Sequence, residues 1–365
     1  MPLFSNRYFL PAMLAALLFS AACHKKPAPM PAPTDDATLQ SAASFPVGAA
    51  ISVDLLRNNV GYSSLVSAQF SSITTENVLK FDAVEPAENQ FNFTDGDYMV
   101  TFAVQRHKRL HAHNLIWHQA LPNWVINFSG DSLAWENLFK THIETEAAHY
   151  KGEVASWDVV NEAIRDDDGT LRNQDVNPGD GSIWRRHLGA DYIARAFQYA
   201  HEADPNALLF YNDYGQEWNG QKLNAIIALV SSLKNRGIPI DGIGMQMHID
   251  INADNNNMLA ALQKLIATGL KIHISELDIA VNPGNDPNFV FTDPLNAAQS
   301  AKFQYVAHIY NTVPTAQQYG ITTWNVTDGD SWIPWFYNRK DYPLPFDANY
   351  HKKQAFYGFL TGLKN

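Results

Sequence analysis

The sequence predicts an α/β protein that consists mainly of one (β/α)8 barrel. From Phe45 onward, short apolar runs alternate with amphipathic helical stretches, and about eight such units fit into the remaining length. Polar residues follow the apolar runs repeatedly, as expected where barrel strands end in a site. An open, doubly wound sheet is the alternative fold. No glycine-rich phosphate loop follows the first predicted strand, which removes the usual reason for that form.

The predicted strands are short, apolar and rich in β-branched residues. They are Val47–Ile51, Leu110–Trp117, Ser156–Asn161, Leu208–Asn212, Ile243–His248, Leu270–Leu277 and Ile321–Val326, and the second unit ends at Thr75. Between several of them, apolar residues recur at helical spacing. These helices are Ser132–Tyr150, Tyr192–Ala203 and Leu223–Arg236. Each helix would return the chain to the start of another parallel strand.

The composition indicates a globular protein with a neutral ligand. Hydrophobic residues make up 46% of the 365 residues and charged residues 17%, which is too apolar for a disordered chain. The formal net charge of -11 argues against a nucleic-acid partner, because phosphate binding needs a basic face. Nine tryptophans offer flat apolar surfaces for stacking, although core packing uses the same residues.

The N-terminus predicts export. Residues 9–19 form an apolar run too short to span a bilayer, with Arg7 before it and small residues after it. We therefore expect residues 1–22 to be a signal peptide. The small residues before Cys23, the one cysteine, resemble a bacterial lipoprotein signal, in which Cys23 would be lipidated. Ser20 stands where Leu is usual, and ordinary cleavage after Ala22 is the alternative.

A proline-rich segment separates this N-terminus from the barrel. Residues 23–44 contain Pro27, Pro29, Pro31 and Pro33 and no apolar periodicity, which predicts an extended tether. Such a tether suits a domain held away from a membrane by its lipid, at the cell surface or in the periplasm; without the lipid the protein would be secreted. The barrel domain would then span residues 45–365, and we expect it to be a monomer.

Polar and aromatic side chains cluster where the predicted strands end. Barrel sites form at these carboxyl ends, so the side chains are expected to converge. Packing interiors avoid charge, and solvent-facing ends have no need of Trp and His together. The candidate residues are Glu76, Asn77, Lys80, His113, Trp117, Asn161, Glu162, Asn212, Gln246, His248, Glu276, Asp278, Trp324 and Trp332.

Glu162 and Glu276 form a pair of carboxylates among these residues. Glu162 follows the fourth strand and Glu276 ends the seventh, so the two should face each other across the barrel mouth. Glycosidic cleavage needs such a pair, one carboxyl as general acid and the other as nucleophile or base. A single strand-end glutamate is often a solvated surface residue, and its partner is what favours chemistry.

The segments around these glutamates resemble the glycoside hydrolase family 10 endo-β-1,4-xylanases. Motifs of that family recur in order from Phe45 to the C-terminus. They are Thr75–Lys80, His113–His118, Trp157–Ala163, Tyr211–Tyr214, Gln246–His248, His273–Asp278 and Thr323–Trp332. The resemblance implies a barrel that hydrolyses internal β-1,4-xylosidic bonds of xylan with retention of configuration, through a covalent glycosyl-enzyme.

The resemblance also implies a role for each candidate residue. Glu162 would be the acid/base and Glu276 the nucleophile, with their carboxyl groups about 5 to 5.5 Å apart. Asn161 would bind the sugar 2-hydroxyl, and His248, oriented by Asp278, would hold Glu276 in place. The others would bind substrate: Glu76, Asn77 and Lys80 its hydroxyls, Trp324 and Trp332 its ring faces, and His113, Trp117, Asn212 and Gln246 the surroundings of the cleaved bond.

Three positions depart from the family pattern. Phe81 stands where Trp is usual, Ala120 where Gln is common, and Gly215 where Asn is frequent. The Phe is a conservative change. The Ala removes a hydrogen bond near the cleaved bond unless the neighbouring Gln119 replaces it.

Two other functions stay open. Another β-1,4-glycanase, acting on glucan or cellulose, would use the same barrel, and the gap between Trp324 and Trp332 would decide whether the hydroxymethyl group of glucose fits. A non-catalytic carbohydrate-binding lipoprotein would need the aromatic walls but neither glutamate. No metal or other cofactor is expected, because no set of ligands at metal-binding spacing accompanies His111 and His113.

Overall fold

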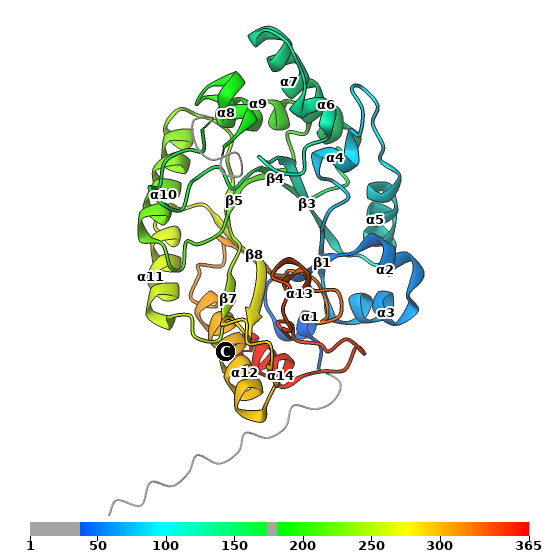
Figure 1. Ribbon diagram of the computed structural model, residues 1–365, viewed down its shortest axis with the longest axis vertical. Coiled ribbons are helices and arrows are strands. Elements are labelled where there is room, and N and C mark those ends of the chain that lie inside the picture. Colours follow the sequence, from blue (N-terminus) through cyan, green and yellow to red (C-terminus); the bar gives the residue numbers. More distant parts are fainter. Residues whose placement is uncertain (1–36, 174–180, 365) are drawn as a thin grey trace, which may run out of the picture. The chain divides into compact units, whose positions relative to one another are not determined.

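Eight parallel strands close into a barrel, as the sequence predicts. A computed structural model describes residues 37–173 and 181–364. Around the ring the strands follow the order β1-β2-β3-β4-β5-β6-β8-β9, and β9 pairs with β1 (Figure 1). These strands are β1 (Val47–Ile51), β2 (Ser72–Thr75), β3 (Arg109–Ile116), β4 (Ser156–Asn161), β5 (Leu208–Asp213), β6 (Gly242–Met245), β8 (Lys271–Ala280) and β9 (Gln318–Thr323). The short strand β7 (His248–Asp250) pairs with the last residues of β8.

The predicted strand Leu270–Leu277 ends three residues before β8 does, and two other predicted strands differ from the observed ones for a local reason. The predicted strand Ile243–His248 is divided between β6 and β7, because Met247 takes φ +63° and interrupts the extended backbone. The predicted strand Ile321–Val326 begins three residues too late and ends three too late compared with β9. Asn325, with φ +76°, cannot continue a strand.

Helices surround the ring of strands (Figure 1). The predicted helix Tyr192–Ala203 has the same bounds in the structure, and its buried residues form one apolar face. The predicted helix Ser132–Tyr150 begins after Asp131, whose carboxylate accepts a hydrogen bond from the backbone of Ala134. The helices are α1 (Leu39–Ala42), α2 (Val53–Asn58), α3 (Val60–Gln69), α4 (Phe81–Val84), α5 (Thr94–Gln105), α6 (Asn123–Ile126), α7 (Ser132–His149), α8 (Ile183–Leu188), α9 (Tyr192–Ala203), α10 (Gly220–Asn235), α11 (Asn255–Ile266), α12 (Asp293–Tyr310), α13 (Trp332–Phe336) and α14 (Gln354–Leu363).

The folded domain begins earlier than the predicted boundary at residue 45. Helix α1 buries Leu39 completely, and the backbone amide of Leu39 donates to Gln69 Oε1 at 3.2 Å. Residues 39–44 therefore belong to the domain. Burial of the Leu39 side chain stabilises this segment on the fold, although the residues around it are mostly polar. The predicted signal peptide, Cys23 and the first part of the tether lie outside the described residues. No helix within residues 37–173 and 181–364 is long and apolar enough to cross a membrane.

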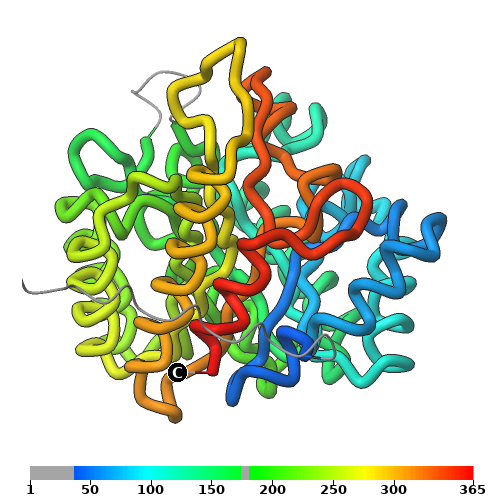
Figure 2. The backbone as a smooth tube through the Cα atoms, turned by 90° about the horizontal axis from the view of Figure 1, so that it is seen from below, coloured from blue at the N-terminus to red at the C-terminus, as the bar shows by residue number. Residues whose placement is uncertain are grey.

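The last helix, α14, packs closely against α12 (Figure 2). Gly358 makes this approach possible, because a Cβ atom at that position would lie 2.1 Å from the carbonyl oxygen of Ser300. Helix α14 is thus an integral part of the helical layer.

Candidate active site

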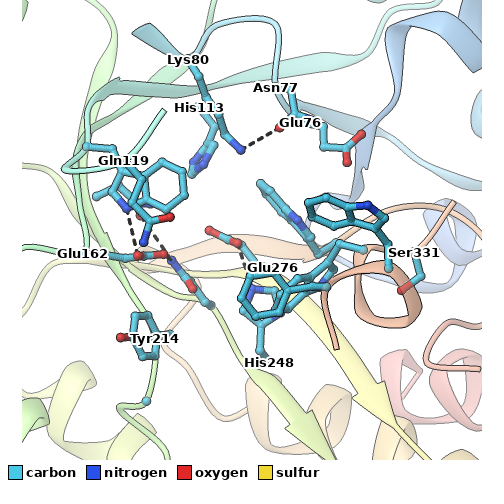
Figure 3. Close-up of a pocket in the computed structure, with 18 of the residues that line it drawn as sticks. Glu76, Asn77, Lys80, His113, Gln119, Glu162, Tyr214, His248, Glu276 and Ser331 are labelled. Atoms are coloured by element: carbon cyan, nitrogen blue, oxygen red, sulfur yellow. Dashed lines mark hydrogen bonds and ion pairs between the residues drawn. The ribbon is translucent and has the colours of Figure 1, made fainter. Parts of the chain in front are cut away.

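The carboxyl ends of the barrel strands open into one cleft of about 940 Å³. The structure brings most of the sequence-predicted site residues together in its lining (Figure 3). These residues are Glu76, Asn77, Lys80, His113, Trp117, Asn161, Glu162, Gln246, His248, Glu276, Trp324 and Trp332. Asn212 and Asp278 do not line the cleft, because both side chains are fully buried beneath it.

Glu162 is the first residue after β4 and has an unusual backbone. Its φ is +54°, a left-handed conformation that a glutamate seldom adopts. Two hydrogen bonds to the Glu162 backbone hold this conformation: the Glu162 amide donates to the carbonyl of Asn212 at 2.9 Å, and the side-chain Nε of Arg172 donates to the carbonyl of Glu162 at 2.7 Å. The chain thereby fixes the direction in which the carboxyl group enters the cleft.

The Glu162 carboxyl group is held in a setting that favours its protonated form. Trp117 Nε1 donates to Oε2 at 2.9 Å and Gln246 Nε2 donates to Oε1 at 3.0 Å. Burial raises the pKa of Glu162, and the negative charges of Asp213 and Glu276 raise it further. The two hydrogen bonds oppose this rise because they stabilise the charged form. A carboxyl group with a raised pKa can donate a proton near neutral pH.

Glu276 lies inside β8, with its carboxylate bound at both oxygens. Asn212 Nδ2 donates to Oε1 at 2.6 Å, and His248 Nε2 lies 3.1 Å from Oε2. The backbone amide of Glu276 donates to the carbonyl of Gln246 at 3.0 Å, which continues the pairing of β8 with the end of β6. The side chain is therefore fixed in direction and only 4% of the residue is exposed.

His248 connects Glu276 to a second buried carboxylate. Its Nδ1 lies 2.8 Å from Asp278 Oδ2, which also accepts a hydrogen bond from Trp332 Nε1 at 2.7 Å. Burial acts to lower the pKa of His248, but Asp278 and Glu276 outweigh it and raise this pKa well above its usual value. A protonated His248 places positive charge beside Glu276 and donates to both carboxylates.

Three side-chain amides, from Asn161, Asn212 and Gln246, join the two glutamates. Asn212 Nδ2 donates to Glu276 and also to Asn161 Oδ1 at 3.0 Å. Gln246 Nε2 donates to Glu162 and also to Asn161 Oδ1 at 3.3 Å. Both contacts use the Oδ1 atom of Asn161, and its Nδ2 makes no hydrogen bond within the described residues. Asn161 therefore presents a free amide donor to the cleft.

The predicted substrate contact of Asn212 is wrong. Its side chain is fully buried, its Oδ1 accepts a hydrogen bond from Ser275 Oγ at 2.6 Å, and its Nδ2 is used by Glu276 and Asn161. Gly244 on β6 leaves the space for it, since a Cβ atom there would lie 2.0 Å from Asn212 Oδ1. Asn212 therefore positions the side chains of Asn161 and Glu276.

Glu76, Asn77 and Lys80 lie together in another part of the cleft wall (Figure 3). Lys80 Nζ donates to Asn77 Oδ1 at 2.7 Å and lies 5.2 Å from the centre of the Trp117 ring. Burial lowers the pKa of Lys80, against the opposing effect of Glu276, Glu76 and Glu162. Burial has the opposite effect on Glu76 and raises its pKa, because in both residues burial disfavours the charged form. The group offers both donors and acceptors to a polar ligand.

Aromatic rings form the walls next to Glu276. The Trp324 ring lies edge-on to His113, with ring centres 5.1 Å apart, and the Trp332 ring lies 5.0 Å from that of His248. Trp324 is 7% exposed, while Trp332 is half-buried. His113 is oriented from below, because its Nδ1 lies 2.8 Å from Asp158 Oδ2. Flat apolar walls beside a polar floor suit a sugar ring.

The three departures from the family pattern have different settings. Phe81 is buried and stacks on His142, with ring centres 3.5 Å apart. The replacement of the usual Trp by Phe81 therefore lies in the core. Ala120 has φ +49°, and its carbonyl accepts from Asp82 at 3.0 Å. The neighbouring Gln119 does line the cleft, as does Gly215. Gln119 therefore places a side-chain amide in the cleft next to the position of Ala120.

Several cleft residues were not predicted as site residues. They are Gln119, Tyr214, Gly215, Trp218, Asp330, Ser331, Trp335, Phe336 and Tyr337. Tyr214 occurs within a predicted motif, and the aromatic run 335–337 directly follows a predicted wall residue. The signal for that run was its density of aromatic residues, which a solvent-facing loop does not need.

Comparison with known proteins places the chain in a family. The model described as Glycosyl hydrolase family 10 matches residues 37–361. Endo-1,4-beta-xylanase A from Cellvibrio japonicus (strain Ueda107) is 37% identical over 348 residues, which are 89% of this chain and 56% of that protein. Exoglucanase XynX from Acetivibrio thermocellus is 35% identical over 335 residues, which are 88% of this chain and 29% of that protein. The chain thus spans about half or less of the length of these two relatives.

A solved structure supports the same placement. Xylanase10C from Cellvibrio japonicus, determined as a variant in complex with xylopentaose, superposes with a TM-score of 0.84 at 34% sequence identity. The superposition covers 90% of this chain and 69% of that one. Since the family model spans nearly the whole described domain and the relatives share its fold, the chain belongs to glycosyl hydrolase family 10.

Proposed function

We propose that the protein is a retaining endo-β-1,4-xylanase. The observation that carries this proposal is the pair Glu162 and Glu276, which enter one cleft from β4 and β8 in different settings. The carboxyl group of Glu162 has a raised pKa. The carboxylate of Glu276 is bound by the side-chain amide of Asn212 and the imidazole of His248. Two carboxyl groups with such unequal environments suit the acid and nucleophile of glycoside hydrolysis.

The reaction proceeds in two displacements. In the first, a Glu276 oxygen attacks the anomeric carbon while Glu162 gives its proton to the glycosidic oxygen, so the bond breaks and a glycosyl ester forms. In the second, Glu162, now ionised, takes a proton from water, and the water oxygen attacks the same carbon and releases Glu276. Two inversions return the original configuration, and both glutamates recover their starting protonation states.

The neighbouring residues support these steps. Asn161 directs its unused Nδ2 to the sugar 2-hydroxyl, a contact that strengthens as positive charge develops on the ring. His248, held by Asp278, keeps Glu276 aimed at the anomeric carbon. Asn212 supports Asn161 and Glu276 from below. This arrangement avoids reorganisation of the site during the reaction.

Xylan is the proposed substrate because of the cleft walls and the relatives. Trp324 and Trp332 provide ring faces, and Glu76, Asn77 and Lys80 provide partners for the hydroxyls of the adjoining sugar. Xylose has no hydroxymethyl group, so it needs less room beside these rings than glucose does. The relative named Exoglucanase XynX keeps a β-1,4-glucanase as the second candidate.

Parallel digestion of xylan, mixed-linkage glucan and cellulose tests the proposal. We expect short xylo-oligosaccharides of several lengths from xylan at early times, which is the pattern of internal cleavage, and little release of sugar from the two glucans. Faster hydrolysis of glucan would establish the second candidate. Absence of hydrolysis on all three polymers would refute catalysis as the function.

Replacing Gln246 with Ala should shift the alkaline limb of the pH–rate profile to higher pH. The Gln246 hydrogen bond lowers the pKa of Glu162 from the raised value set by burial and by Asp213, because it stabilises the charged carboxylate. Activity requires protonated Glu162 and falls as pH rises through this pKa. Losing the bond therefore extends activity upward in pH.

The measurement is kcat/KM against pH on a soluble oligosaccharide. Gln119→Ala serves as the control, since Gln119 lines the cleft but has no hydrogen bond to Glu162 within the described residues. The control should keep its alkaline limb in place. An alkaline limb that stays fixed or moves down in Gln246→Ala would contradict the role of Glu162 as the acid.

We also propose that the protein is exported and anchored by a lipid on Cys23, and that it acts as a monomer. The apolar run before Cys23 and the small residues next to it support the export and the lipid anchor. Cys23→Ser should move the protein from the membrane fraction to the soluble fraction of the producing cells. Continued co-sedimentation of the variant with membranes would refute the anchor.

A further inference from the structure

A row of aromatic rings leads from the catalytic centre to the protein surface. The ring of His248 contacts those of both Trp324 and Trp332, with ring centres 6.3 and 5.0 Å apart. Phe336 follows at 5.1 Å from Trp332, and Trp335 at 6.4 Å from Phe336. Exposure increases outward, from 7% for Trp324 to 60% for Phe336 and 83% for Trp335. All five residues line the same cleft.

The rings of Trp335 and Phe336 do not anchor helix α13 to the barrel. Helix α13 is fixed at its inner end, where Trp332 Nε1 donates to Asp278 and the Trp332 backbone amide donates to Asn325 Oδ1 at 3.2 Å. Ile333 is buried below it. Trp335 and Phe336 point outward from this anchor with most of their surface exposed to water. Among the described residues, Trp335 has the most exposed large apolar side chain.

We propose that Trp335 and Phe336 form a distal platform that stacks one more sugar of the bound polysaccharide, beyond those held between Trp324 and Trp332. This inference rests on the proposed function. A linear chain that occupies the cleft beside Glu276 has to continue along its lining, and the aromatic row gives the continuation a surface of the same kind. A neutral glycan chain suits this surface, because the apolar face of a sugar ring packs on an aromatic ring without the need for a charged partner.

The platform should affect long substrates and leave short ones unchanged. We expect a chain of two or three sugars to occupy the inner part of the cleft, next to Glu276, without contacting Trp335. A chain of six reaches it and gains one stacking contact. A single aromatic contact corresponds to an affinity difference of about threefold to tenfold.

The test measures binding in the inactive Glu276→Ala protein by titration calorimetry. Xylotriose and xylohexaose are compared with and without a second change, Trp335→Ala. Tyr342→Ala is the matched control, because Tyr342 is also an exposed aromatic residue at 36% but does not line the cleft. We expect Trp335→Ala to weaken xylohexaose binding by about threefold to tenfold, with xylotriose binding unchanged and the control unaltered for both ligands.

Two outcomes would overturn the platform. Unchanged xylohexaose binding would show that Trp335 does not contact the chain. An equal loss for xylotriose would show that Trp335 shapes the inner cleft instead. Cellotriose and cellohexaose are titrated in parallel: if the active protein cleaves glucan and not xylan, the same comparison is made with the glucan pair, so failure of the proposed substrate is distinguishable from failure of the platform.

Discussion

Replacing Glu276 with Ala should abolish hydrolysis of xylan, with kcat lower by a factor on the order of 10⁵. The first displacement needs a carboxylate oxygen at the anomeric carbon, and no other carboxylate is bound by both Asn212 and His248 among the described residues. The variant should still fold, because Asn212 keeps its hydrogen bonds to Asn161 and Ser275 and His248 keeps Asp278.

Activity and thermal unfolding of this variant are measured together. Glu146→Gln provides the control for replacing a buried carboxyl group, since Glu146 is fully buried and does not line the cleft. We expect the control to keep its activity even if its melting temperature changes. Substantial xylan hydrolysis by folded Glu276→Ala would sink the nucleophile assignment.

Replacing Glu162 with Ala should lower kcat/KM on xylan by about 10² to 10⁴ and spare aryl xylosides that carry a good leaving group. The sugar leaving group of the polymer needs a proton as its bond breaks, whereas an activated phenolate leaves without one. The variant should also lose the alkaline limb of its pH profile, because no proton with a raised pKa has to be retained.

The comparison of the two substrates isolates the acid role. Both are measured on the same Glu162→Ala preparation, so a general loss of folded protein lowers them equally. Equal losses in kcat/KM on xylan and on the aryl glycoside would argue against proton donation by Glu162. A variant that retains the wild-type alkaline limb would argue against it as well.

The meeting of Glu162 and Glu276 in one cleft was predictable, because the barrel brings the ends of strands that are distant in sequence together in space. Glu162 directly follows β4 and Glu276 lies within β8, and the carboxyl ends of parallel barrel strands meet at one face. Lys80 and Trp332 were found for a related reason, since motifs at strand ends converge on the same cleft.

The role of Asn212 was not predictable from its own segment. It depends on register, which places Asn212 opposite Asn161 on one side and Gly244 on the other. Because Gly244 has no side chain, the side-chain amide of Asn212 can lie below the cleft, where it donates a hydrogen bond to Glu276. A residue at a strand end is exposed or buried according to its neighbours on adjacent strands, and these are distant in sequence.

The limits of the domain and of the cleft escaped prediction for other reasons. Leu39 lies within a polar and proline-containing composition, and only its packing against the folded chain shows that the domain has begun. Trp335 and Phe336 follow a wall residue in sequence, but their exposure is a property of how α13 is anchored. Composition alone does not separate an exposed tryptophan from a buried one.

The configuration of the first product tests the paired roles of Glu162 and Glu276 most directly. Proton NMR follows the anomeric signals while a xylo-oligosaccharide is being cleaved, before mutarotation equilibrates them. Double displacement through Glu276 predicts that the β-anomer appears first and the α-anomer only later. Initial formation of the α-anomer would mean that water attacks directly, and it would contradict the covalent intermediate on Glu276.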